Sequence, residues 1–178
     1  MTEQPTKPLI VTGSHADVLA DIEAIPRFHA GGPGAFDFMA VGLDAVDRYA
    51  WPIRWCATFH PAEIPSIRAR REGRIGRVDF SIISHERRDG VDLFVPAWWT
   101  PSGSSALLAV QAAITLLGYR RVVLAGCPLT GKNAQGGDYE NFHRGWEPRR
   151  KDLIPRVRSM SGWTAEFLGK PTEDWLWG

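Results

Sequence analysis

Three small residues, Ser102, Gly103 and Ser104, immediately precede a strongly apolar segment of the chain. Alanine, leucine, valine and isoleucine recur in that segment at intervals of three and four residues, which predicts a helix over residues 104–117. The first N–H groups of a helix have no acceptor within the helix, so a loop of this kind presents them to an anion. We therefore expect Ser102, Gly103 and Ser104 to bind a nucleotide phosphate. The alternative is that these serines only cap the helix.

A second group of chemically capable side chains lies in residues 128–148, a polar segment that contains several glycines and shows no apolar periodicity. A segment of this length without periodicity is typical of a functional loop or lid. His143 has an ordinary pKa near neutrality and is a candidate general base, while Arg144 is a candidate for stabilising a departing phosphate. The alternative is a solvent-facing loop in which both side chains make only local hydrogen bonds.

Alternating strands and helices would position these segments. The pattern predicts strands at residues 8–12, 36–42, 53–59, 78–84, 91–96, 122–125 and 156–162. It predicts helices at residues 16–25, 43–50, 60–71, 104–117 and 163–168, with a further helical turn capped by Thr172. This order is typical of a doubly wound α/β fold with a mostly parallel sheet, which is Rossmann-like. The length of 178 residues fits a single domain over residues 1–178.

Ligands of such sheets bind beyond the carboxyl ends of the strands. Gly13 and Ser14 follow the first expected strand, and His60 follows the third. We therefore expect Gly13, Ser14 and His60 to bind the nucleotide together with the 102–104 loop. Other residues that follow strands, and so belong at the same edge, are Gly42, Asp44 and residues 127–130.

Composition excludes several function classes. A net charge of +1 gives no basic excess for a nucleic-acid partner, and no apolar run reaches the length of a membrane span. The N-terminus lacks the layout of a signal peptide, so we expect a cytoplasmic protein. Cys56 and Cys127 do not have a metal-type spacing, and we expect neither a metal nor a cofactor. A metal-dependent hydrolase built from Asp44, Asp138 and His60 is the weakest alternative, because no spacing requires it.

Two further stretches have unusual compositions. The arginine-rich residues 68–77 are expected to be a solvated helix face and turn rather than a binding patch. The chain contains 8 tryptophans, which gather partly in the C-terminal segment of residues 156–178. We expect this segment to dock on the protein's own core or on a neighbouring subunit, and the second case would make the protein a homo-oligomer.

Motifs at both ends of the helix at residues 104–117 resemble those of a known group of proteins. Ser102-Gly103 precedes this helix, and Leu117-Gly118-Tyr119 ends it. On these motifs the chain resembles the Rossmann-like group that joins the bacterial CMP-sugar-dependent sialyltransferases to the archaeal pterin diphosphokinase-like proteins. Phages and prophages also encode small proteins of this type. The resemblance covers roughly residues 8–140 and implies a Rossmann-like fold with a nucleotide site.

Other motifs of that group are altered in this chain. Residues 13–17 lack the second glycine and the Pro-Ser pair of the group's first loop, His60-Pro61 stands in place of Asn-Pro or Asp-Pro, and Pro128 replaces an acidic residue. Tyr139 matches the tyrosine that supports the departing phosphate in the sialyltransferases. The catalytic histidine of those enzymes lies further along the chain, so His143 would be a substitute.

These observations leave two expected functions open. The first is a nucleotide- or sugar-nucleotide-binding protein that acts as a glycosyltransferase-like transferase, with His143, Tyr139 and Arg144 as catalytic residues. The second is a non-catalytic nucleotide-binding or sequestering module of phage origin. The polar 128–148 segment favours the first, whereas Pro128 and the altered first loop favour the second.

Overall fold

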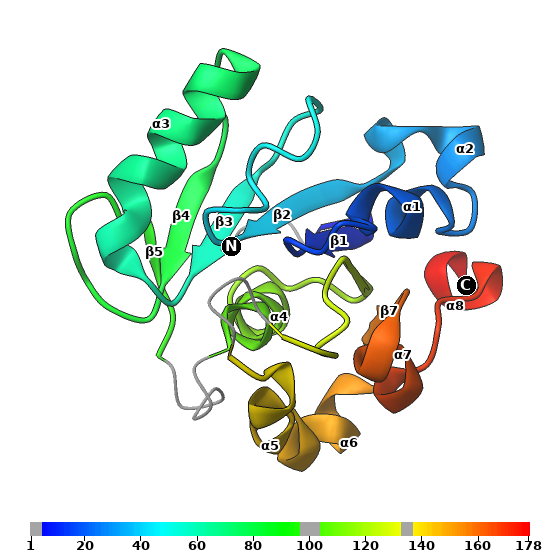
Figure 1. Ribbon diagram of the computed structural model, residues 1–178. Helices are drawn as coiled ribbons and strands as arrows, with labels where there is room; N and C mark the ends of the chain where they lie inside the picture. The colour runs from blue at the N-terminus through cyan, green and yellow to red at the C-terminus, as the bar shows by residue number, and fades with distance from the viewer. Residues whose placement is uncertain (1–4, 97–103, 133–136) are drawn as a thin grey trace.

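The structure is a computed structural model that describes residues 5–96, 104–132 and 137–178. A central sheet lies between two layers of helices (Figure 1). Its seven strands are all parallel and are arranged in the order β5-β4-β3-β2-β1-β6-β7. This arrangement confirms the expected doubly wound α/β fold. The strands are β1 (Leu9–Thr12), β2 (Asp37–Val41), β3 (Trp55–Thr58), β4 (Ser81–Ser84), β5 (Leu93–Phe94), β6 (Val122–Ala125) and β7 (Val157–Ser159).

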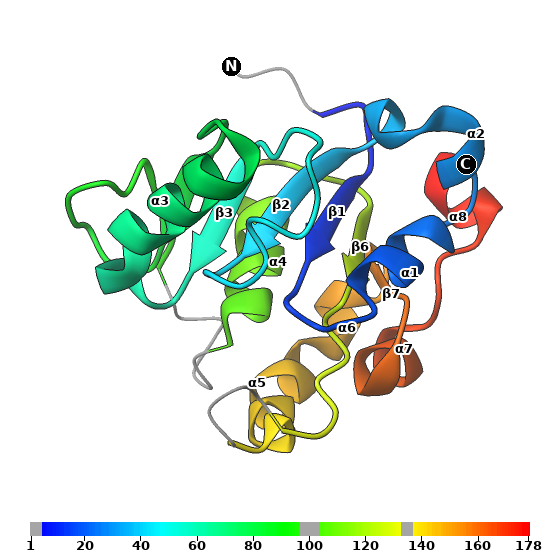
Figure 2. The ribbon, with the colours of Figure 1, turned by 45° about the horizontal axis from the view of Figure 1, so that its top comes forward.

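Within the described ranges, four α-helices pack on each face of the sheet, and Figures 1 and 2 show the two layers. One layer consists of α1 (Val18–Glu23), α2 (Phe28–Gly31), α3 (Ile64–Ile75) and α8 (Glu173–Trp177). The other consists of α4 (Ser105–Thr115), α5 (His143–Trp146), α6 (Arg150–Leu153) and α7 (Gly162–Leu168). Short 3₁₀ turns occupy Pro33–Ala35, Pro61–Glu63, Tyr139–Phe142 and Glu147–Arg149. No helix in the described ranges is long and apolar enough to cross a bilayer.

Alternate residues of the inner strands belong to different cores. In β1, Leu9 and Val11 pack in the core beneath α4, whereas Ile10 packs in the core beneath α1 and α3. Successive side chains of a strand point to opposite faces of the sheet. Because both faces are buried, β1 and β6 need nearly uninterrupted apolar sequences. The sheet therefore lies between two hydrophobic cores, one on each face.

The helix expected at residues 43–50 is not present, and this prediction was wrong. Residues 43–47 form turns, and Tyr49 is buried with its hydroxyl 2.8 Å from Thr12 Oγ1. Backbone carbonyls of this segment accept hydrogen bonds from the Arg71 side chain on α3. Donors supplied by a distant residue therefore replace the amides that a local helix would have supplied.

The 128–148 segment also differs from a simple polar loop. Residues Tyr139–Phe142 form a 3₁₀ turn, and α5 follows directly. Trp146 at the end of α5 has no exposed surface and belongs to the core beneath α4. The second half of this segment is therefore anchored in the core.

The C-terminal segment docks on the protein's own core. Thr172 caps α8 by accepting a hydrogen bond from the Trp175 amide, as expected. The Trp175 ring lies 5.1 Å from the Arg121 guanidinium and 4.9 Å from that of Arg158, and Leu176 is buried. These contacts are intramolecular, whereas Trp177 in the same helix stays 38 % exposed.

Candidate functional site

A pocket of about 620 Å³ lies at the carboxyl edge of the sheet, where the strand order reverses. The chain runs from β1 outward to β5 and then returns to the opposite side of β1 as β6. The loops that leave β1 and β6 diverge at such a point, and this is where ligands of open α/β sheets bind. The lining residues are Gly13, Ser14, Val41, Gly42, Leu43, Asp44, His60, Glu63, Ser104, Ser105, Ala106, Gly126, Cys127, Pro128, Leu129, Tyr139 and Phe142.

Two glycines form the junction between β1 and β6. A Cβ at Gly13 would lie 2.1 Å from the carbonyl oxygen of Gly126, so no side chain fits there without a backbone shift. Gly126 has a φ of +65°, and a Cβ there would lie 2.7 Å from Val18 Cβ at the start of α1. Gly13 is needed because the backbones of the two loops touch there, and Gly126 is needed because its φ is positive and the Val18 side chain fills the adjacent space.

The buried Asp21 carboxylate holds this junction from the α1 side. Its Oδ2 accepts a hydrogen bond of 2.7 Å from the Gly126 amide and another of 2.7 Å from the Ser161 hydroxyl. Asp21 therefore connects α1, the end of β6 and the start of α7. Because its partners are fixed by three elements, this part of the pocket is organised without a ligand.

Leu129 continues the pocket wall in a strained conformation. Its φ of +48° is uncommon for a residue other than glycine, and its side chain is buried against the core. The Leu129 carbonyl lies 2.8 Å from His143 Nε2, and the His143 ring stacks on Trp163 with a centroid distance of 3.7 Å. His143 thus supports the wall from behind and is not among the lining residues.

The N-terminus of α4 opens into the pocket. Ser104 is the N-cap, because its Oγ accepts a hydrogen bond from the Leu107 amide at 3.3 Å, which confirms the capping prediction. Ser105 Oγ accepts a hydrogen bond of 3.1 Å from the Phe59 amide and so ties α4 to the end of β3. The first turn of α4 carries no acidic residue that would oppose an anion. Ser102 and Gly103 lie outside the described residues.

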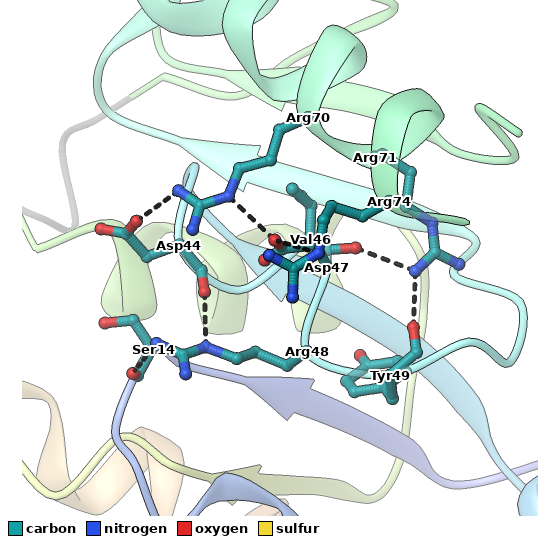
Figure 3. A network of polar contacts seen from close by, with 9 residues as sticks. All are labelled: Ser14, Asp44, Val46, Asp47, Arg48, Tyr49, Arg70, Arg71 and Arg74. Carbon is teal, nitrogen blue, oxygen red and sulfur yellow. Dashed lines mark hydrogen bonds and ion pairs between the residues drawn. The ribbon is translucent and has the colours of Figure 1, made fainter. Parts of the chain in front are cut away.

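The facing wall comes from the segment after β2, which includes Asp44. Arg48 bridges two pocket loops by donating hydrogen bonds of 2.9 Å to the carbonyls of Ser14 and Asp44 (Figure 3). Arg70 on α3 donates a hydrogen bond of 2.7 Å to Asp44 Oδ1 and one of 3.0 Å to Asp47 Oδ2. The bond to Asp47 is the main cause that raises the pKa of Arg70, and the bond to Asp44 adds to it.

Arg71 on α3 anchors the same segment from inside the protein. It has no exposed surface and donates hydrogen bonds of 2.9, 2.7 and 2.9 Å to the carbonyls of Val46, Tyr49 and Trp51. It also bonds the Asp79 carboxylate at 3.2 Å. The expectation that residues 68–77 form a solvated face was therefore wrong for Arg71. Apolar periodicity gives no signal for a buried arginine.

The structure brings together some of the residues predicted from the sequence. Gly13, Ser14, His60, Ser104 and Tyr139 all line the pocket. His143 and Arg144 do not line it, and Asp138 is also outside the lining. Sequence reasoning missed Glu63 and Phe142 as lining residues, although Glu63 lies only three residues beyond His60 and carried a positional signal.

The pocket offers carboxylates and an imidazole for proton transfer but no activated sulfur. Burial raises the pKa of the Cys127 thiol to about 12, and the nearby Asp21 carboxylate adds to the increase. The thiol is protonated at neutral pH and is a poor nucleophile. Within the described ranges, no group of three or more histidine, cysteine or acidic side chains could hold a metal ion.

The lining residues come from separate loops between Gly13 and Phe142, so no short motif spans the pocket. Comparison of the chain with protein-family models, curated proteins and solved structures finds no match.

Proposed function

We propose that the protein binds a nucleotide or sugar nucleotide in the pocket at the strand-order reversal, with a phosphate group against the N-terminus of α4. The observation that carries this proposal is that α4 starts at the pocket wall and has no acidic side chain in its first turn. Helix N–H groups and the helix dipole favour an anion at that place. The volume of about 620 Å³ lies within the range of small-molecule sites.

The pocket walls offer different chemical groups, which suits a ligand that carries a phosphate, a ring and hydroxyl groups. The N-terminus of α4 would hold the phosphate, and the aromatic side chains of Tyr139 and Phe142 offer a surface for a base. Asp44 and Glu63 lie among the lining residues as acceptors for hydroxyl or amino groups. A nucleotide carries all three kinds of group.

Binding without catalysis and group transfer from a nucleotide-activated donor are both compatible with this ligand. A non-catalytic role is favoured because His143 and Arg144 are not lining residues and the Cys127 thiol is protonated. Transfer is the second candidate, and the presence of His60, Glu63 and Tyr139 around the same space favours it. In that case His60 or Glu63 would act as the base and Tyr139 would contact the departing phosphate.

The phosphate position is tested by Ser105→Asp, which puts a negative charge at the first position of α4. Acidic residues in the first turn stabilise a helix, so the variant should fold, but its charge should repel a phosphate. We expect affinity for nucleoside 5′-monophosphates to fall about tenfold or more by calorimetry, with the weak binding of free nucleosides unchanged. Ser66→Asp, in the first turn of α3 and outside the pocket, is the matched control. Equal affinities for both variants would place the phosphate elsewhere.

The transfer candidate is tested by incubating the protein with the sugar nucleotides that it binds and following donor cleavage by mass spectrometry. Loss of a general base typically costs a factor of a hundred or more, so Glu63→Gln or His60→Gln should reduce cleavage by at least that factor. Donors that stay intact with every acceptor tried would leave the binding module as the function.

A further inference from the structure

We propose that a second pocket, at the amino edge of the sheet, binds a small ligand that carries a phosphate group and a planar ring. This site is separate from the nucleotide pocket, which lies at the opposite, carboxyl edge. The second pocket has a volume of about 440 Å³, within the range of small-molecule sites. It is lined by residues 5–8, which lead into β1, by Arg120 and Arg121 before β6, and by residues 176–178 at the end of α8. Figure 2 shows the chain entering β1 at this edge, with α8 at the same end of the molecule.

The lining of this second pocket is positively charged. It includes the side chains of Lys7, Arg120 and Arg121, and its described residues include no aspartate or glutamate. The lining stays positive when the α-carboxylate of Gly178 is counted. A phosphate monoester carries a charge of about −1.5 to −2 at neutral pH, so it matches several cations better than a carboxylate does.

Arg121 is the cation that is held in place with donors to spare. Within the described part of the chain its guanidinium bonds only backbone carbonyls, those of Arg120, Pro155 and Trp175, so no carboxylate neutralises it. These bonds use Nε and Nη1, which leaves the two N–H donors of Nη2 for a ligand. An oriented guanidinium of this kind loses little further freedom when a phosphate binds.

A second arginine adds to the positive potential beside the pocket. The guanidiniums of Arg121 and Arg158 lie 5.1 and 4.9 Å from the centre of the Trp175 ring. Burial lowers the pKa of Arg158, and the charge of Arg121 lowers it further, which shows that the two like charges oppose each other. The Trp175 Nε1 atom is a buried donor with no partner among the described residues. Donors thus outnumber acceptors here, and an anion at Arg121 would offset the repulsion.

Trp177 offers a surface for the rest of the ligand. Its side chain lines the pocket and is partly exposed, and its ring packs edge-on against Phe36 with a centroid distance of 5.6 Å. Leu176, which is buried, adds an apolar contact to the same lining. A tryptophan that is fixed by a neighbour and still open to solvent can stack on a planar ring. An aromatic phosphate would therefore use both the cationic and the apolar part of the pocket.

The test titrates the protein with phenyl phosphate and follows the indole N–H signal of Trp177 and the Nε–H signal of Arg121 by NMR. We expect saturable shifts of both signals. Arg121→Gln should weaken binding about tenfold, which is the effect of losing one charge-assisted contact. Arg156→Gln is the matched control, because Arg156 is exposed and precedes β7 at the same edge but is not a lining residue. Ser105→Asp, which acts on the nucleotide pocket, should also leave the affinity unchanged.

A second variant is needed because Arg121→Gln also removes the bond to the Trp175 carbonyl, which anchors α8. Lys7 is exposed and its Nζ bonds the Gly34 carbonyl at 2.8 Å, so Lys7→Gln should fold normally and still lower the affinity for phenyl phosphate. Benzoate carries a ring but a single charge, and inorganic phosphate carries no ring, so both should bind more weakly than phenyl phosphate.

Four results would each overturn the inference. Phenyl phosphate would leave the Trp177 signal in place, Lys7→Gln would keep the full affinity, Arg156→Gln would weaken binding as much as Arg121→Gln, or benzoate would bind as tightly as phenyl phosphate. A loss of affinity in Ser105→Asp would move the phosphate to the nucleotide pocket and would overturn it as well. The nucleotide titrations test the other pocket, so either proposal can fail while the other stands.

Discussion

Replacement of Arg71 by methionine should destabilise the protein more than replacement of any other arginine on α3. Methionine fills a similar volume but donates no hydrogen bond. Arg71 has no exposed surface and bonds three backbone carbonyls in the 46–51 segment together with the Asp79 carboxylate. The substitution leaves these acceptors without their donor in a place that water cannot easily reach.

The expected cost follows from the number and burial of those acceptors. The bonds to Val46 and Tyr49 are buried, and those to Trp51 and Asp79 are partly buried. A buried group that loses its partner costs roughly 1–3 kcal/mol, and a broken buried ion pair costs about 3–5 kcal/mol. Apolar contacts of methionine offset part of this loss. We therefore expect Arg71→Met to lower the free energy of unfolding by about 4 kcal/mol, a large part of the 5–15 kcal/mol that is typical of a domain.

Urea denaturation followed by tryptophan fluorescence measures this change, with Arg74→Met as the matched control. The Arg74 side chain is 70 % exposed and lies 3.8 Å from Asp47, so its removal should cost less than about 1 kcal/mol. Arg71 holds the segment that follows β2, and this segment supplies the lining residues Leu43 and Asp44. Any nucleotide that binds the wild type should therefore bind Arg71→Met more weakly. A loss below about 1 kcal/mol for Arg71→Met, or equal losses for both variants, would refute the reasoning.

Three further changes test other parts of the pocket. Gly13→Ala brings a Cβ to 2.1 Å from the Gly126 carbonyl oxygen, so it should lower the melting temperature by several degrees and weaken ligand binding. Ser104→Ala removes the acceptor for the Leu107 amide and should cost about 1 kcal/mol in urea denaturation. Cys127, whose pKa burial raises to about 12, should resist iodoacetamide at pH 8 in the native protein and react once the protein is denatured, as mass spectrometry would reveal.

Each of these changes has a control or a contrary outcome. Gly34→Ala introduces a Cβ with no atom within 4 Å, so a comparable melting loss there would contradict the steric argument for Gly13. Thr172→Ala removes the cap of α8, far from the pocket in sequence, and should reduce stability without changing ligand affinity. Rapid alkylation of native Cys127 would show that the thiol is accessible and ionised.

The sequence by itself determined the elements whose signal is local. Apolar periodicity predicted the helix at residues 104–117, and Ser104 caps it as expected. Gly118 has the left-handed φ of +75° that the end of this helix requires. The alternation of strands and helices predicted a mostly parallel sheet, and its seven strands are all parallel. The rule that ligands bind at the carboxyl edge then selected Gly13, Ser14 and His60, which all line the pocket.

Tertiary structure decided what depends on partners distant in the chain. The 43–50 segment has a helix-like composition, yet its carbonyls at Val46 and Tyr49 take donors from Arg71, more than twenty residues away. Neighbouring residues were likewise separated: Tyr139 lines the pocket, whereas His143 stacks on Trp163 and bonds the Leu129 carbonyl behind the wall. The periodicity of the local sequence does not encode contacts between distant residues. The packing of α3, α5 and α7 against the sheet therefore decided which polar side chains line the pocket.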